Sequence, residues 1–234
     1  VIIPVVVIFL FFMAIGPNVK WIKNKFINFK IYLLIFLAAV LLNFIIFSFF
    51  KSYSVISNLI VISSLFLIFS SIFDVFKKKR WNFSRVISHL SFGLLILFIG
   101  LNHNFSVEKD FNLKLGEVKK IDNYKFSLLD LKLNQETNYK AIVGKMEVSN
   151  LDTMEKRILN PEIRIYDNPQ TLTYEASIQT NFLGDHYLTM SNIDRSEYYN
   201  IKFQHKPLMI WIWISVVLLS FGGFLSLFKN AKNN

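Results

Sequence analysis

Long apolar runs constrain this chain more than any other feature of its sequence. Five uncharged stretches lie at Val1–Ile15, Ile31–Phe50, Val55–Phe73, Val86–Leu101 and Leu208–Phe228. A helix needs roughly 20 residues to cross about 30 Å of hydrocarbon. The second, third and fifth runs have this length, and the fourth has it when Trp81–Arg85 is counted as its interfacial end. The pattern predicts a polytopic α-helical membrane protein with spans near 1–15, 31–50, 55–73, 84–101 and 208–228.

The first run is short, starts with Val, and lacks the basic start and small-residue cleavage site of a secretory signal. We therefore expect a truncated span, and the chain to be the C-terminal part of a longer membrane protein.

The net charge of +10 is confined to the parts of the chain beside the apolar runs. Residues 102–207 hold 14 Lys and Arg against 15 Asp and Glu, whereas the rest of the chain holds 12 basic residues and one acid, Asp74. With five spans, Lys51 lies on one face of the membrane. The other eleven lie on the opposite face: Lys20, Lys23, Lys25, Lys30, Lys77, Lys78, Lys79, Arg80, Arg85, Lys229 and Lys232. Basic loops mark the cytoplasmic side and argue against nucleic acid as a partner. The prediction is a periplasmic domain at 102–207 and a cytoplasmic tail at 229–234, in a bacterial inner membrane or, alternatively, a mitochondrial one.

Residues 102–207, about 105 in all, read as one all-β domain, a sandwich or a barrel. Period-two alternation predicts strands, separated by Asn- and Asp-rich turns, at 124–133, 141–148, 162–166, 174–179, 186–191 and 198–204. The chain has no cysteine, which excludes disulfides, thiol-disulfide chemistry and covalent heme attachment to this chain. It also lacks a phosphate-binding glycine loop, a His/Cys metal cluster and a nucleophile elbow, so no catalytic residue is assigned.

His89 is the only histidine inside an apolar run. Ionisable side chains in membrane spans are costly, and a neutral imidazole can ligate heme iron. The alternative is a histidine bonded to a neighbouring helix or to headgroups, since His89 lies only about 6 Å deeper than Arg85. Small neighbours, Ser91 and Gly93, would allow a flat cofactor to pack closely. No other span supplies a histidine, and outside the last run the only span methionine is Met13.

The remaining polar residues have ordinary structural explanations. His103 and His205 flank the β domain and read as interfacial residues, although they would be able to approach one another, and His186 reads as structural. Asp74 is expected to pair with Lys77 or Lys78. Trp211 and Trp213 fit an interfacial aromatic belt, and Gly222-Gly223 a close helix contact.

Several short patterns, in order, resemble the C-terminal part of the CcmF family, the membrane heme lyases of the multi-component cytochrome c maturation system. They are Gly16-Pro17-Asn18-Val19-Lys20-Trp21, His89-Leu90-Ser91-Phe92-Gly93, Asn138-Tyr139, Pro161-Glu162-Ile163-Arg164-Ile165-Tyr166, Glu175-Ala176-Ser177-Ile178, Asp185-His186-Tyr187, and the end from Lys206-Pro207 through Trp211-Ile212-Trp213 to Gly222-Gly223. Ser91 stands where the family commonly has Gly. The ordered set is more specific than any one of its motifs.

The resemblance implies that His89 is an axial ligand of a structural b-type heme, with its partner ligand upstream of Val1. The family's tryptophan-rich heme-handling loop and its outward heme-holding histidines are absent from this sequence. The resemblance further implies a fragment of a membrane heme lyase that helps attach transient substrate heme to apocytochrome c on the outer face. Lyase activity is expected only of the full-length protein in its complex. Its partners would be other maturation subunits, including the heme chaperone, as well as apocytochrome c and the bilayer. The alternative from the residues alone is a non-enzymatic, membrane-anchored β-domain scaffold or sensor.

Overall fold

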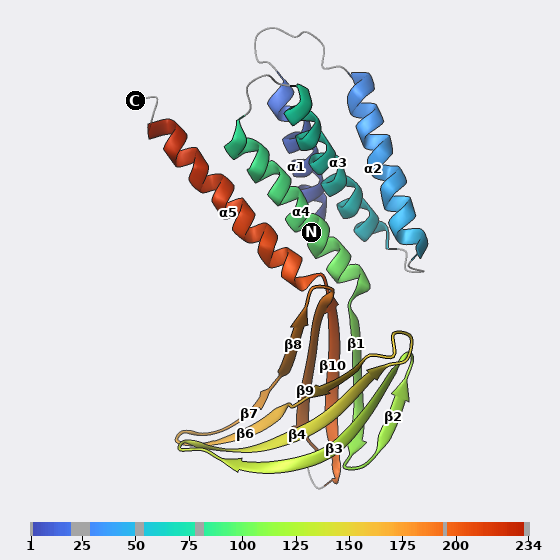
Figure 1. The fold of residues 1–234 in the computed structure, drawn as a ribbon, viewed down its shortest axis with the longest axis vertical. Coiled ribbons are helices and arrows are strands. Elements are labelled where there is room, and N and C mark those ends of the chain that lie inside the picture. Colours follow the sequence, from blue (N-terminus) through green and yellow to red (C-terminus); the bar gives the residue numbers. More distant parts are fainter. Residues whose placement is uncertain (1, 20–28, 50–53, 78–81, 194–195, 232–234) are drawn as a thin grey trace. The chain divides into compact units, whose positions relative to one another are not determined.

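The computed structural model describes residues 2–19, 29–49, 54–77, 82–193 and 196–231, and these form two units. One unit contains the helices and the other, Ser106–Pro207, contains the strands (Figure 1). The basic residues at 20–25, 51 and 78–80 lie outside the described residues, so the predicted arrangement of loop charges stays a prediction.

Five α-helices and one short 3-10 helix make up the first unit: α1 (Ile2–Ile15), η1 (Gly16–Asn18), α2 (Phe29–Phe49), α3 (Val55–Lys77), α4 (Phe83–Phe105) and α5 (Met209–Ala231). Four of them are long and apolar enough to cross a membrane, while the segment Pro4–Asn18 is shorter. α1 gives way to η1 at Gly16-Pro17, because proline lacks the N–H that would continue the α-helix.

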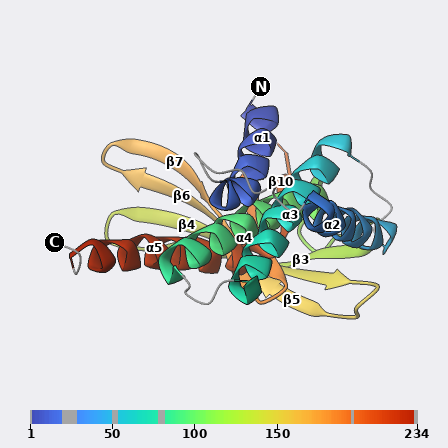
Figure 2. The same ribbon diagram turned by 90° about the horizontal axis from the view of Figure 1, so that it is seen from above.

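Helix α3 is the most enclosed of the helices. It contacts α1, α2 and α4, and α5 packs on α4 (Figure 2). Two asparagines join α2 to α3: the Asn43 amide donates to Asn58 Oδ1 at 2.7 Å, and Asn58 donates to the Ser54 carbonyl at 2.9 Å. Since hydrocarbon offers no water to these groups, the bonds fix the two helices in register.

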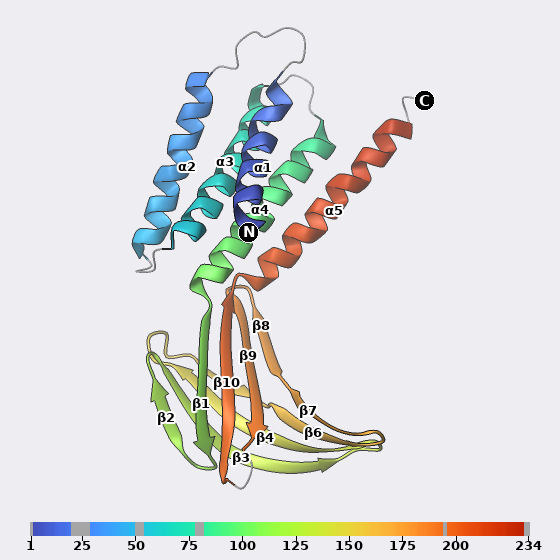
Figure 3. The same cartoon turned by 180° about the vertical axis from the view of Figure 1, so that it is seen from behind.

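The second unit is a β-sandwich of ten antiparallel strands. They are β1 (Val107–Lys114), β2 (Val118–Ile121), β3 (Tyr124–Gln135), β4 (Tyr139–Asn150), β5 (Lys156–Leu159), β6 (Glu162–Asp167), β7 (Gln170–Glu175), β8 (Ser177–Asn181), β9 (Gly184–Asn192) and β10 (Tyr198–Pro207). One sheet has the order β1-β10-β9-β8. The other has the order β2-β3-β4-β6-β7, with β5 added on β4 (Figure 3).

The core of the sandwich lies between the two sheets and is rich in aromatic residues. The Phe126 ring lies 4.6 Å from the Phe111 ring and 5.2 Å from the Phe203 ring, measured between centroids. Gly144 on β4 allows close approach, because a Cβ there would lie 2.8 Å from Met190 Sδ on β9. This core confirms the predicted all-β domain held without disulfides.

The strand predictions differ from the structure in two places. The segment 174–179 is not one strand: β7 ends at Glu175, and after Ala176 the chain enters β8 in the other sheet. In addition β1, β2 and β5 were not predicted, because they are short or carry mostly charged residues. In β1, for example, only Val107, Phe111 and Leu113 are apolar and pack on the core, and Lys109 interrupts their alternation.

Candidate functional site

His89 lies near the N-terminal end of α4, on the face turned toward α1. Its imidazole is half-buried and hydrogen-bonds to the backbone of Met13 in α1. Phe92, three residues further on the same face, packs edge-on against Phe9 with ring centroids 6.1 Å apart. When one ring nitrogen donates to a backbone carbonyl, the other carries the lone pair of the neutral imidazole. A hydrogen bond from one ring nitrogen to the Met13 backbone would leave the other nitrogen of His89 able to bind a metal.

Gly93 and Gly100, four and eleven residues after His89 on nearly the same side of α4, pack against α3. A Cβ on Gly93 would lie 2.8 Å from Ile68 Cγ1 of α3, and a Cβ on Gly100 would lie 2.9 Å from Ile60 Cγ2. Ser91 is buried, and its hydroxyl donates to the Ile87 carbonyl at 2.7 Å. Helix α3 occupies the space beside Gly93, whereas the expected place of Ser91 beside a flat cofactor stays a prediction.

A polar cluster lies close to His89 at the same end of the helices. The two N–H groups of the Asn18 amide reach Tyr32 Oη at 2.6 Å and Asp74 Oδ1 at 2.7 Å. Asp74 is buried, and its Oδ2 lies 4.0 Å from the Arg85 guanidinium. Lys78 and the side chain of Lys77, its expected partners, lie outside the described residues. Asp74 and Arg85 both act electrostatically on the His89 ring. The sequence offered one hint of this arrangement, the spacing of four residues between Arg85 and His89.

The described part of the helical unit places no second histidine beside His89. Groups of three or more His, Cys, Asp or Glu with metal-binding geometry do not occur among these residues. The other histidine of the helical unit, His103, is fourteen residues further along α4, about 21 Å at 1.5 Å per residue. Heme iron normally takes two axial ligands, so His89 fits one half of such a site.

The β unit holds a second histidine site, which the sequence did not predict. His186 on β9 is directly opposite His205 on β10, and their ring centroids are 4.4 Å apart. His186 is buried, and Nδ1 of both rings lacks a hydrogen-bond partner among the described residues. Burial, His205 and the Arg157 charge lower the pKa of His186 to about 4, and burial and Arg157 also lower the pKa of His205. Both rings are therefore neutral at pH 7, which agrees with the structural interpretation of His186.

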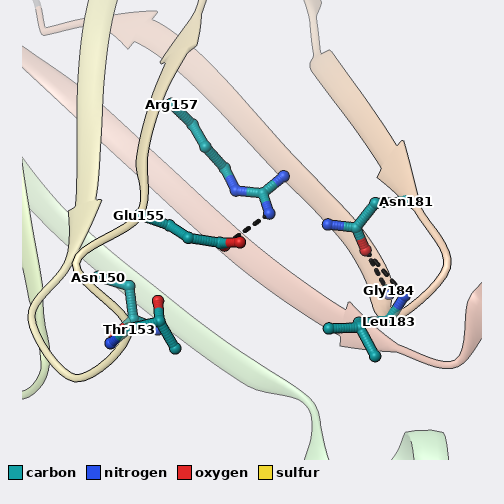
Figure 4. A network of polar contacts seen from close by, with 7 residues as sticks. All are labelled: Asn150, Thr153, Glu155, Arg157, Asn181, Leu183 and Gly184. Carbon is teal, nitrogen blue, oxygen red and sulfur yellow. Dashed lines mark hydrogen bonds and ion pairs between the residues drawn. The ribbon is translucent and has the colours of Figure 1, made fainter.

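Local polar contacts near the β4–β5 and β8–β9 turns are shown in Figure 4. Arg157 pairs with Glu155 at 2.8 Å, and the Arg157 hydrogen bond lowers the pKa of the exposed Glu155 carboxyl. In the β8–β9 turn, Asn181 Oδ1 accepts the backbone N–H groups of Leu183 at 2.9 Å and Gly184 at 2.8 Å. These contacts fix the shape of that turn.

The Asn-Tyr motif and the Pro-Glu-x-Arg-x-Tyr motif lie on the neighbouring strands β4 and β6. Tyr139 of β4 pairs in register with Tyr166 of β6, with ring centroids 5.2 Å apart. The Arg164 guanidinium lies 4.8 Å from the centre of the Tyr139 ring and pairs with Glu162 at 2.8 Å. Hydrogen bonds from this guanidinium to Glu162 and Tyr166 raise its pKa further. The Asn-Tyr and Pro-Glu-x-Arg-x-Tyr motifs therefore form one half-exposed cluster of stacked aromatic and charged groups.

Comparisons with known proteins agree with this architecture. Residues 104–207 match the family described as CcmF C-terminal beta-sandwich. Cytochrome c-type biogenesis protein CcmF of Escherichia coli is 24% identical over 229 residues, which cover 94% of this chain and 35% of the relative. CcmF of Haemophilus influenzae is 25% identical over 236 residues, with 94% and 36% covered.

The solved structure titled Cytochrome c Heme Lyase CcmF shares the fold. It matches with a TM-score of 0.76 at 16% identity, covering 96% of this chain and 39% of the other. This chain spans about a third of the length of the two curated relatives. Residues 104–207 therefore match the CcmF C-terminal beta-sandwich family, and the chain as a whole is similar to about a third of the length of the two CcmF relatives.

Proposed function

We propose that this chain works in cytochrome c maturation as part of a membrane heme lyase, in which His89 is one axial ligand of a b-type heme. The whole assembly would attach heme to apocytochrome c on the outer face of the membrane, with the β unit outside. The observation that carries the heme assignment is His89 itself, a half-buried imidazole that contacts the Met13 backbone from a helix long and apolar enough to span a membrane. The CcmF relatives, named for cytochrome c biogenesis, support the role.

Each residue around His89 has a defined part in this proposal. Met13 holds the ring so that its second nitrogen presents a lone pair. Arg85, one helical turn earlier, places a positive charge where an anionic group beside the ring would be stabilised, and Asp74 and Asn18 hold that end of the helices together. When bound, the b-type heme would supply an electron-transfer centre able to reduce the substrate heme. Its other axial ligand would come from outside the described residues.

The donor set fits heme iron better than other metals. A single neutral imidazole without nearby thiolates or a carboxylate ligand set gives no zinc or calcium site among the described residues. An imidazole from a membrane helix is a common axial ligand of b-type heme iron. The site therefore needs one further ligand rather than a set of three.

Spectroscopy of the intact complex tests the ligand assignment. The full-length protein that carries this segment would be purified with its maturation partners, as wild type, His89→Ala and His103→Ala. We expect His89→Ala to lose most of its b-type Soret absorption and pyridine hemochrome, whereas His103→Ala, at the other end of the same helix, keeps both. An unchanged Soret band in His89→Ala would overturn the assignment. A wild-type complex without heme would instead favour the scaffold or sensor.

Apocytochrome c, the heme chaperone and other maturation subunits are the proposed partners, and the proposed location is a bacterial inner membrane with the β unit in the periplasm. Protease treatment of intact spheroplasts tests the orientation. We expect cleavage within residues 106–207 from the outside, while a tag after Asn234 stays protected. The reverse pattern would contradict the proposed topology.

A further inference from the structure

The β8–β9 turn exposes two large apolar side chains at the end of the sandwich from which both membrane helices continue. Phe182 is 70% exposed and Leu183 is 75% exposed. Large apolar side chains this exposed, side by side at a turn, favour a partner that is itself apolar.

The strand register places this turn at the end of the sheet where β1 begins and β10 ends. Gly184, which follows the turn, is paired with Pro207, the last residue of β10, and Val107, the first residue of β1, is paired with His205. Only Leu208 separates β10 from α5, and only Ser106 separates α4 from β1. Leu183 and Leu208 are therefore the first residues beyond the sheet on two neighbouring strands, whose spacing is about 5 Å.

The turn is also held tightly at this level. A Cβ on Gly184 would lie 2.6 Å from the Lys206 carbonyl oxygen and 2.7 Å from Pro207 Cα, so the backbones of β9 and β10 are in close contact there. The two hydrogen bonds to Asn181 Oδ1 fix the turn itself (Figure 4). The apolar side chains are thus presented by rigid backbone rather than by a mobile loop.

The start of α5 locates the membrane boundary in the sequence. Its spanning segment begins at Met209, and Trp211 and Trp213 lie in its first turns. Tryptophan at a helix end marks the interfacial layer, and three residues of helix rise only about 5 Å. Because only Leu208 separates Pro207 from Met209, the paired Gly184 and the adjacent Leu183 are connected to that layer through only a few residues of chain.

We propose that Phe182 and Leu183 insert into the interfacial layer of the lipid bilayer and form a second, non-helical membrane contact of the β unit. The two side chains bury their apolar surface among headgroups and upper acyl chains, as interfacial Phe and Leu do. This proposal does not depend on the heme assignment.

These 234 residues contain no cysteine, so single-site labelling tests the proposal once any cysteine elsewhere in the full-length protein has been replaced. Phe182→Cys, Leu183→Cys and Leu115→Cys would each be made in the full-length protein, labelled with an NBD fluorophore, and placed in nanodiscs of phosphatidylcholine and phosphatidylglycerol. Leu115 is the matched control. It is an exposed apolar residue in the β1–β2 turn, at the opposite end of the sheet and about 26 Å along the strand from Val107.

We expect labels at 182 and 183 to be quenched by lipids that carry a nitroxide near the headgroup, and to be several-fold less accessible to aqueous iodide than the label at 115. Quenching by iodide equal to that of the 115 label, with no effect of the nitroxide lipids, would overturn the proposal. Protection from both quenchers would also overturn it, because it would indicate a covering protein. Nitroxide spin labels at the same cysteines, compared for oxygen and nickel accessibility, give an independent measurement.

Discussion

The contact between Ser88 and Gly222 shows how single small residues hold the helices together. A Cβ on Gly222 would lie 2.6 Å from Ser88 Oγ and 2.9 Å from the Ser88 backbone nitrogen, while the Ser84 hydroxyl donates to the Gly222 carbonyl at 2.7 Å. A side-chain rotation relieves the first contact but not the second. We expect Gly222→Ala to lower the stability of the α4–α5 pair by about 1–3 kcal/mol, measured by thermal unfolding in detergent.

Gly223 offers a matched control one residue away. A Cβ at Gly223 would meet no atom within 4 Å, and alanine also favours a helix more than glycine does. We expect Gly223→Ala to leave stability unchanged or to raise it by up to about 1 kcal/mol. Equal losses for the two variants would contradict a contact specific to Gly222.

At His89 the sequence predicts the residue but not its surroundings. Its position in an apolar run and its chemistry single it out, whereas the hydrogen bond to Met13 joins positions 76 residues apart. Gly93 shows the same limit, since its small size was assigned to a cofactor but it faces α3. In helices that are apolar all round, periodicity does not reveal which face meets which neighbour.

Among the elements, η1 ties three helices through Asn18. Its amide donates both hydrogens, one to Tyr32 on α2 and one to Asp74 on α3. We expect Asn18→Ala to destabilise the helical unit by about 1–3 kcal/mol, because it leaves the buried Asp74 without this donor. Thermal unfolding in detergent measures the change.

A second variant at this position separates charge from packing. Asn18→Asp keeps the size of the side chain but places another acceptor against Asp74. We expect it to be more destabilising than Asn18→Ala at pH 7, because two carboxylates in one buried site repel each other. An aspartate variant as stable as wild type would show that the hydrogen bond to Asp74 contributes nothing.

In the β unit, the sequence predicts the strands that bury one face in the core. It does not predict which strands pair with one another. Strands β3, β4, β6, β9 and β10 alternate clearly, because one face of each supplies the core. The break at Ala176 lies inside a continuous alternating pattern, so only the pairing of β7 with β6 and of β8 with β9 reveals the change of sheet. The His186–His205 pair has the same origin, since register between strands is a long-range property.

At the scale of the whole molecule, the two units are stabilised by different means. The helical unit relies on small-residue contacts and a few buried polar bonds, as expected where lipid removes most of the hydrophobic driving force. The β unit is a sandwich with an aromatic core between its sheets. Conditions that act on one kind of interaction should therefore affect one unit before the other.

Acid is such a condition, because the β unit buries two neutral histidines. The pKa of His186 is about 4 in the folded protein, below the value of about 6.5 expected for the unfolded chain. Between these values the unfolded chain binds more protons. The free energy of unfolding of the β unit is therefore highest above about pH 6.5, and it decreases as the pH falls toward 4. His205 shifts in the same direction, and Arg157 adds positive charge beside both rings. We expect the β unit to lose about 2–3 kcal/mol over this range.

Unfolding of the β unit in detergent, followed by the near-ultraviolet circular dichroism of its tyrosines at pH 7 and pH 4.5, measures this loss. His186→Gln removes the titrating group, so its stability should fall less between the two pH values than that of wild type, even if it starts lower. The exposed carboxyl of Glu108, whose pKa is lowered by Lys202, contributes equally to both proteins and cancels in the comparison, whereas Glu155 interacts with His186 and its contribution changes with it. His103→Gln, a substitution in α4, should keep the wild-type pH dependence. The same pH dependence in His186→Gln as in wild type would mean that other groups, and not this pair, make the β unit sensitive to acid.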